Sequence, residues 1–245
     1  GSIQCLRSKS TSEILAAASG TSFSVIVDGE FLPEQPRALY DRGDIAKVPY
    51  ILGSNTDEGT LFTTSLSNVT TDDAYRAAIS QRVGAQAVEA VLERYPVSKF
   101  KDQPQPYQAA LARVFGDQSL VCSTYDAALR AAKAGASTWL YNFDIAANAG
   151  GLGATHGSEL VYVFGTSPNL TEDQKRASAG IQSYWTNLAK KGDPNGADLT
   201  EWPKFSADND VRVNLALEFK AVEKFRSSEC ELWRSLYDAS YNAAK

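Results

Sequence analysis

The stretch Val48-Pro-Tyr-Ile-Leu-Gly-Ser-Asn-Thr-Asp-Glu-Gly59 indicates the fold class of this 245-residue chain. Its first six residues are a short apolar run of the kind that forms a buried strand in a parallel sheet. The polar residues 54–59 then form a turn. A predicted helix at residues 33–43 comes before the strand, with Pro33 at its start and Gly43 at its end. Helices and strands that alternate in this way predict an α/β fold.

Further predicted helices and strands lie on both sides of this stretch. Residues 172–191 form the clearest helix, because Thr171 and Gln174 make a capping box and apolar residues recur along one face. Residues 137–144 form a second buried strand, which a glycine-rich loop follows. The other predicted segments are helices at 5–19, 71–95, 104–134 and from 227 onward, a strand at 23–29, and a segment at 212–219. No repeat or linker divides the chain, and so we expect one compact unit.

Composition argues against several classes of function. The formal net charge of −5 disfavours binding to nucleic acid or to an anionic membrane surface. No apolar run approaches the roughly 18 residues that a transmembrane helix needs. The chain begins with neither a signal peptide nor a methionine and contains no methionine at all. We therefore expect a processed or cleaved chain.

The one histidine of the chain, His156, lies in the glycine-rich loop after the second buried strand. Imidazole is the natural proton carrier in catalysis, because its ordinary pKa lies closest to neutrality. Glu58 follows the first buried strand, and loops at the carboxyl ends of parallel strands share one edge of the sheet. We therefore expect Glu58 to bind His156 there, fixing its tautomer and stabilising the imidazolium. The alternative is a structural or surface histidine and a solvated acid in a turn.

Two glycosylation sequons fit a protein of the secretory pathway, although such short patterns also arise by chance. The sequons are Asn68-Val-Thr70, in a turn rich in serine and threonine, and Asn169-Leu-Thr171, just before the capping box. We expect both asparagines to be exposed and to carry sugar. The three cysteines, Cys5, Cys122 and Cys230, are an odd number, which in a secreted protein indicates a bond to another chain or a free thiol.

Two segments resemble motifs of the cholinesterase-like type-B carboxylesterases and lipases, a family with the α/β-hydrolase fold. Gly53-Ser-Asn-Thr-Asp-Glu-Gly-Thr60 is similar to the segment that holds the acid of the family's catalytic triad, which assigns that role to Glu58. Thr155-His-Gly-Ser-Glu-Leu-Val-Tyr-Val-Phe-Gly165 is similar to the His-Gly-x-Glu segment, which assigns the triad base to His156. Five further segments match in order: Cys5–Arg7, Val25–Gly29, Phe115–Asp117, Tyr184–Asn187 and Gly192–Asn195.

The resemblance covers only the C-terminal half of the family's catalytic domain. The triad serine of this family precedes the acid and lies in a Gly-x-Ser-x-Gly elbow, which these residues do not contain. The nearest look-alike, Ala177-Ser-Ala-Gly180, lacks the first glycine and lies in a predicted helix. We therefore expect residues 1–245 to supply the last strands of a mostly parallel sheet flanked by helices. The N-terminal half of the domain is expected on a separate chain, unless the chain is an inactive fragment.

The resemblance implies a secreted fungal esterase or lipase that hydrolyses carboxylic esters without a metal or cofactor. A serine and an oxyanion hole on the partner chain would act with His156 as base and Glu58 as acid. Glu159 matches the acid of the histidine motif, and either supports the loop or is only an acid at the start of a helix. The alternatives are a non-catalytic adhesion or binding protein with this fold and an unrelated α/β binding domain.

The resemblance also implies how the cysteines pair. Cys122 and Cys230 match two cysteines that are bridged in the cholinesterases, and so we expect a disulfide between them. The cysteine that Cys5 matches closes a small surface loop with a cysteine shortly upstream. A cut within that exposed loop would leave Cys5 joined to the N-terminal half, which we expect as a disulfide-linked partner chain.

Overall fold

The computed structural model describes residues 2–146 and 151–243 of the chain, which divides into two compact units, Gly1–Leu39 and Tyr40–Lys245. The first unit holds two short helices, α1 (Ile3–Arg7) and α2 (Thr11–Ala17), neither of which has a buried residue. The prediction of one helix at 5–19 is wrong. Ser10 and Glu13 form a capping box that starts a new helix after the first has ended.

The predicted strand at 23–29 does not form. Its apolar side chains, among them Phe23, Val25 and Ile26, are exposed. A strand needs hydrogen-bonded neighbours, and no strand of the described residues pairs with this segment. The Asp28 carboxylate instead makes a turn, in which it accepts the backbone N–H groups of Glu30 and Leu32.

The second unit contains a four-stranded sheet in the order β1-β2-β3-β4. β1 (Tyr50–Asn55), β2 (Thr138–Phe143) and β3 (Val211–Leu215) are parallel, and β4 (Lys220–Glu223) runs antiparallel to β3. The prediction of a mostly parallel sheet is therefore confirmed, although β4 itself was not predicted. In the β1–β2 register Asn55 pairs with Phe143, and so these two strands end at the same edge of the sheet.

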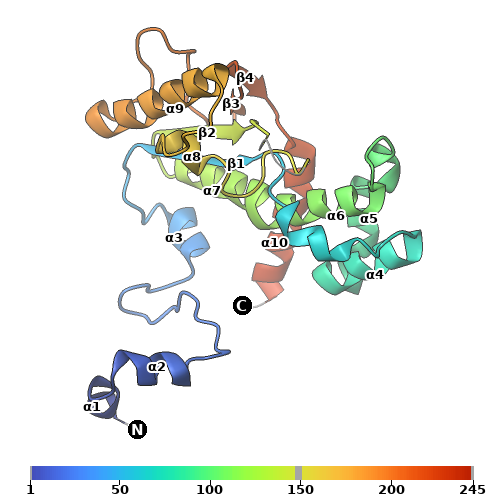
Figure 1. The fold of residues 1–245 in the computed structure, drawn as a ribbon. Coiled ribbons are helices and arrows are strands. Elements are labelled where there is room, and N and C mark those ends of the chain that lie inside the picture. Colours follow the sequence, from blue (N-terminus) through green and yellow to red (C-terminus); the bar gives the residue numbers. More distant parts are fainter. Residues whose placement is uncertain (1, 147–150, 244–245) are drawn as a thin grey trace. The chain divides into compact units, whose positions relative to one another are not determined.

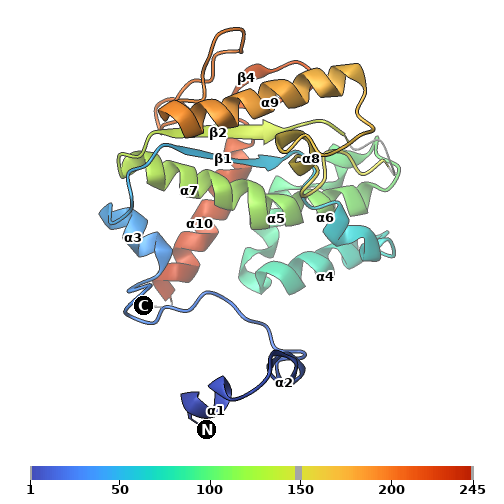
Figure 2. The same cartoon turned by 60° about the vertical axis from the view of Figure 1, so that its left-hand side comes forward.

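Helices cover both faces of this sheet (Figures 1 and 2). α9 (Glu172–Lys191) and α8 (Leu160–Val163) pack on the face that holds Trp139, and α7 (Cys122–Lys133) packs on the face that holds Leu140. Successive side chains of a strand point to opposite faces, which places these two neighbours of β2 in separate cores. The predicted capping box and bounds of α9 are confirmed.

A group of helices beside the sheet has a core of its own, in which Cys122 and Cys230 are buried and joined by the predicted disulfide. A π-helical turn, Asp117–Val121, connects α6 (Pro106–Gly116) to α7. The prediction that residues 71–95 are helical, with a start at Thr71 and a stop at Tyr95, is confirmed. The segment divides at Gly84 into α4 (Asp72–Val83) and α5 (Val88–Arg94), with a 3-10 turn, Ala85–Ala87, between them. The remaining helices are α3 (Pro36–Arg42), α10 (Ser227–Ala243), and 3-10 turns at Leu61–Leu66 and Val97–Phe100. Within the described ranges, no helix has the length and apolar character needed to cross a membrane.

Candidate active site

Glu58 lies in the turn after β1, and its carboxyl group is buried. The backbone N–H of Asn55 donates to its Oε1 at 2.7 Å, and Nδ1 of His156 lies 2.7 Å from its Oε2. Burial raises the pKa of Glu58 above the ordinary value, although both hydrogen bonds act in the opposite direction. As the pH falls, Glu58 therefore loses its charge at a higher pH than an exposed glutamate does.

The acid turn, residues 56–60, packs directly on α6. A Cβ atom at Gly59 would lie 1.8 Å from the carbonyl oxygen of Ala112 and 2.7 Å from the backbone nitrogen of Gly116. Only a residue without a side chain fits at this position. The glycine after Glu58 therefore allows the helix to hold the acid turn in place.

His156 lies in the loop between β2 and α8, and 49% of its side chain is exposed. Its Nδ1 binds Glu58, while Nε2 has no hydrogen-bond partner among residues 2–146 and 151–243. The ring of Phe62 contacts the imidazole, with 5.5 Å between the two ring centroids. The structure thus brings the two predicted residues together and leaves the second ring nitrogen accessible to a group from outside this part of the protein.

Asn55 connects the end of β1 to both sides of His156. Its Nδ2 donates to the carbonyl oxygen of Thr155 at 2.7 Å and to Oε2 of Glu159 at 2.5 Å. Glu159 therefore lies close to the pair without a hydrogen bond to His156, and its charge further raises the pKa of Glu58. No sequence pattern singled out Asn55, although its place directly after the apolar run, in the segment that holds Glu58, was a usable signal.

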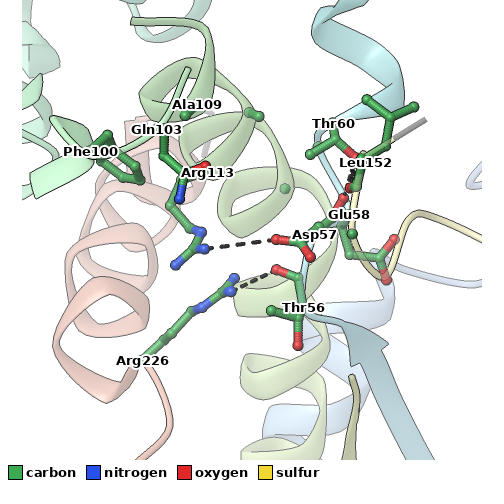
Figure 3. Close-up of a pocket in the computed structure, with 15 residues that line it drawn as sticks. Thr56, Asp57, Glu58, Thr60, Phe100, Gln103, Ala109, Arg113, Leu152 and Arg226 are labelled. Atoms are coloured by element: carbon green, nitrogen blue, oxygen red, sulfur yellow. Dashed lines mark hydrogen bonds and ion pairs between the residues drawn. The ribbon is translucent and has the colours of Figure 1, made fainter. Parts of the chain in front are cut away.

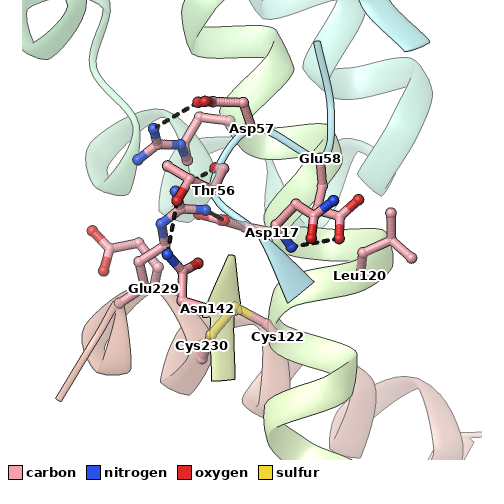
Figure 4. Close-up of polar contacts among 12 residues, drawn as sticks. Thr56, Asp57, Glu58, Asp117, Leu120, Cys122, Asn142, Glu229 and Cys230 are labelled. Carbon is pink, nitrogen blue, oxygen red and sulfur yellow. Dashed lines mark hydrogen bonds and ion pairs between the residues drawn. A yellow bond between two sulfur atoms is a disulfide. The ribbon is translucent and has the colours of Figure 1, made fainter. Parts of the chain in front are cut away.

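A buried ion pair between Arg226 and Asp117 adjoins the acid turn. Figure 3 labels Arg226 with Thr56, and Figure 4 labels Asp117 with Thr56. Arg226, just before α10, donates to Oδ1 of Asp117 at 2.5 Å and to the carbonyl oxygen of Thr56 at 2.6 Å. Burial raises the pKa of Asp117, while the guanidinium groups of Arg226 and Arg113 lower it in part. Asn142 of β2 also donates to the Thr56 hydroxyl at 2.7 Å. These contacts hold Thr56, and with it the acid turn, in place. No pattern in the sequence marked Arg226.

Two cavities adjoin the pair. One of about 250 Å³ lies beside the acid turn and is lined by residues that include Asp57, Arg113 and Arg226 (Figure 3). The other, of about 340 Å³, contains the accessible imidazole of His156; the other lining residues are Phe62, Arg82, Phe115, Ser119 and Leu120. In the described part of the chain, no group of three or more histidine, cysteine, aspartate or glutamate residues is placed to hold a metal ion.

The serine of the elbow look-alike is a structural residue. Ser178 is buried in α9, and its hydroxyl donates to the carbonyl oxygen of Tyr162 at 2.7 Å. The prediction that this serine belongs to a helix is therefore confirmed.

Comparison with known proteins agrees with this arrangement of sheet, acid turn and histidine loop. The profile of the carboxylesterase family matches residues 2–233. The cholinesterase of Mus musculus is 28% identical over 266 residues, which cover 96% of this chain and 44% of the mouse protein. The chain thus spans less than half the length of this relative. The family profile extends over nearly the whole sequence, and the chain belongs to the carboxylesterase family.

Proposed function

We propose that this chain supplies the acid and the base of a Ser-Glu-His triad in a carboxylic ester hydrolase. The observation that carries the proposal is the 2.7 Å contact between the buried carboxyl group of Glu58 and Nδ1 of the half-exposed His156. A carboxylate on Nδ1 leaves the lone pair on Nε2, where a base must receive a proton. Family membership supports ester hydrolysis as the reaction class.

In the proposed mechanism, a serine outside residues 1–245 attacks the ester carbonyl carbon. Nε2 of His156 takes the serine proton and then gives it to the leaving alcohol, while Glu58 stabilises the imidazolium. Water releases the acid by the same steps in reverse. Backbone N–H groups of the serine-bearing part stabilise the oxyanion. Glu159 supports the histidine loop through Asn55, and no step needs a metal or an organic cofactor.

A fluorophosphonate probe tests this proposal on the assembled protein. We expect the probe to modify a serine that lies outside this chain, and His156→Ala to abolish rapid labelling, because the serine then lacks its base. Ser178→Ala is the matched control and should label normally, since Ser178 is buried in α9. A protein that neither labels nor hydrolyses p-nitrophenyl esters would instead be the non-catalytic binding protein.

We further propose that the serine-bearing part is a separate chain, disulfide-linked through Cys5. Cys5 is exposed and is the unpaired cysteine of the described residues, because Cys122 and Cys230 bind each other. Electrophoresis without reductant should show a larger species, from which reductant releases this chain. Cys5→Ser should remove the larger species. A band of the size of this chain alone under both conditions would refute the linkage.

The same proposal includes secretion and N-glycosylation at Asn68 and Asn169. Both asparagines are exposed, one after the 3-10 turn that follows the acid turn and the other shortly before α9. Peptide N-glycosidase should lower the mass of this chain and convert both residues to aspartate. Asn68→Gln and Asn169→Gln should each remove one glycan. An unchanged mass after enzyme treatment would show that neither sequon is used.

A further inference from the structure

The loop that carries His156 is bound to the acid turn through Asp57 as well as through Glu58. Oδ2 of Asp57 accepts the backbone N–H of Ala154 at 3.0 Å, and the backbone N–H of Asp57 donates to the Ala154 carbonyl oxygen at 3.0 Å. Both polar backbone groups of Ala154 are thus held by one residue. Ala154 precedes His156 by only two residues. This pair of bonds therefore fixes the backbone position from which the side chain of His156 projects.

Neighbouring residues allow and extend this contact. The loop backbone at Gly153 has a φ of +76°, and a Cβ atom there would lie 2.0 Å from Oδ2 of Asp57. Glycine therefore permits both the conformation and the close approach of the carboxylate. The hydroxyl of Thr60 donates to the carbonyl oxygen of Leu152 at 3.0 Å, which adds a further bond between the acid turn and the same loop.

Asp57 is separate from the reacting groups. Its other carboxylate oxygen, Oδ1, lies 4.0 Å from Nη2 of Arg113 on α6 (Figure 3), and 28% of its side chain is exposed. It makes no hydrogen bond with His156 or with the carboxyl group of Glu58 in the described part of the chain. Any effect of this side chain on the chemistry must therefore pass through the loop.

We propose that Asp57 is a positioning residue for the base, which it aims by fixing the backbone of Ala154. This inference rests on the proposed function, because it requires His156 to be the base. Glu58 holds the imidazole at one atom, about which the ring can pivot, and the fixed loop removes that freedom. A displacement of about 1 Å in a reacting group can cost on the order of 10²-fold in rate.

Asp57→Ala in the assembled enzyme tests this role with a p-nitrophenyl ester as substrate. We expect kcat to fall by about 10- to 100-fold with little change in KM, since the ester still binds while the base is misplaced. Asp57→Asn keeps an oxygen that can accept the Ala154 N–H, and it should restore kcat to within a few-fold of the wild type. Asp208→Ala, at an exposed aspartate outside the site, is the matched control and should have no effect.

A double variant separates positioning from a general loss of structure. In the His156→Ala background, Asp57→Ala should cause no further loss, because the base that it positions is gone. The inference would be overturned if the double variant lost activity by the product of the two single-variant losses. It would also be overturned if Asp57→Ala alone kept full activity. If Asp57→Ala does not fold, Gly153→Ala disturbs the same contact from the loop side and must lower kcat, or the inference fails. Full activity of His156→Ala would instead overturn the proposed function.

Discussion

Replacing His156 by alanine is expected to lower kcat of the assembled enzyme by about 10⁴- to 10⁶-fold, the range found when a triad base is removed. His156 is the only histidine of the chain, and Nε2 is its one ring nitrogen without a partner among the described residues. KM should change little, because a triad base acts on the transition state rather than on the bound ester. Steady-state kinetics with a p-nitrophenyl ester measures both constants.

Glu58→Gln extends this prediction to the acid. The amide can still accept the N–H of Asn55 through its oxygen, but it then presents an NH₂ group toward Nδ1 of His156. That group favours the tautomer with the proton on Nε2, which cannot act as a base. We expect kcat to fall by about 10⁴-fold. Glu159→Gln is the matched control and should cost far less, since Glu159 contacts Asn55 rather than the imidazole. Equal losses from the two glutamines would contradict the assignment of the acid.

The meeting of Glu58 and His156 could be predicted from sequence because it follows from topology. Each residue comes after a strand that reads as buried and parallel, and parallel neighbours end at one edge of a sheet. The pairing needs no knowledge of side-chain packing. The resemblance to a family then supplied the roles, and the structure supplies the 2.7 Å contact.

The residues that support the pair could not be predicted in the same way. Asp57 and Asn55 bind the histidine loop through backbone groups of Ala154 and Thr155, which have no side-chain signature. Arg226 reaches the carbonyl oxygen of Thr56 from a point 170 residues away in the sequence. Contacts of this kind depend on how helices pack on the sheet, and neither periodicity nor composition encodes that packing.

The elements that were predicted wrongly or missed show which features of the fold a local sequence pattern does not determine. Residues 23–29 have the composition of a strand, but pairing decides whether a strand forms, and these residues have no partner strand in the described structure. The short β4 was missed for the opposite reason, since its pairing with β3 stabilises a segment whose side chains are mostly exposed. The break between α1 and α2 was readable, because Ser10 and Glu13 have capping-box spacing.

Loss of the Cys122–Cys230 disulfide is expected to cause the largest change in stability. The two cysteines are 108 residues apart, and the segment between them includes β2, the histidine loop, α9 and β3. In the chain-entropy model, a cross-link over so long a loop stabilises the folded state by about 4–5 kcal/mol. The Cys122→Ala/Cys230→Ala variant should therefore unfold at a temperature roughly 10–20 °C lower.

Activity separates this effect from damage to the site. Both cysteines lie in the core of the helical group, joined by the disulfide that Figure 4 shows. Among the described residues, neither has a hydrogen bond or ion pair with Glu58 or His156. Well below its unfolding transition the double variant should keep kcat and KM close to the wild type. Ser123→Ala, beside Cys122 in α7, is the matched control and should leave the unfolding temperature nearly unchanged. An unaltered unfolding temperature in the double variant, or free thiols at these positions in a peptide map of the unreduced protein, would contradict the prediction.

α10 begins directly after Arg226, which donates a hydrogen bond to the carbonyl oxygen of Thr56. In the double variant a loosened α10 should therefore weaken this bond first, and activity should fall a few degrees before global unfolding.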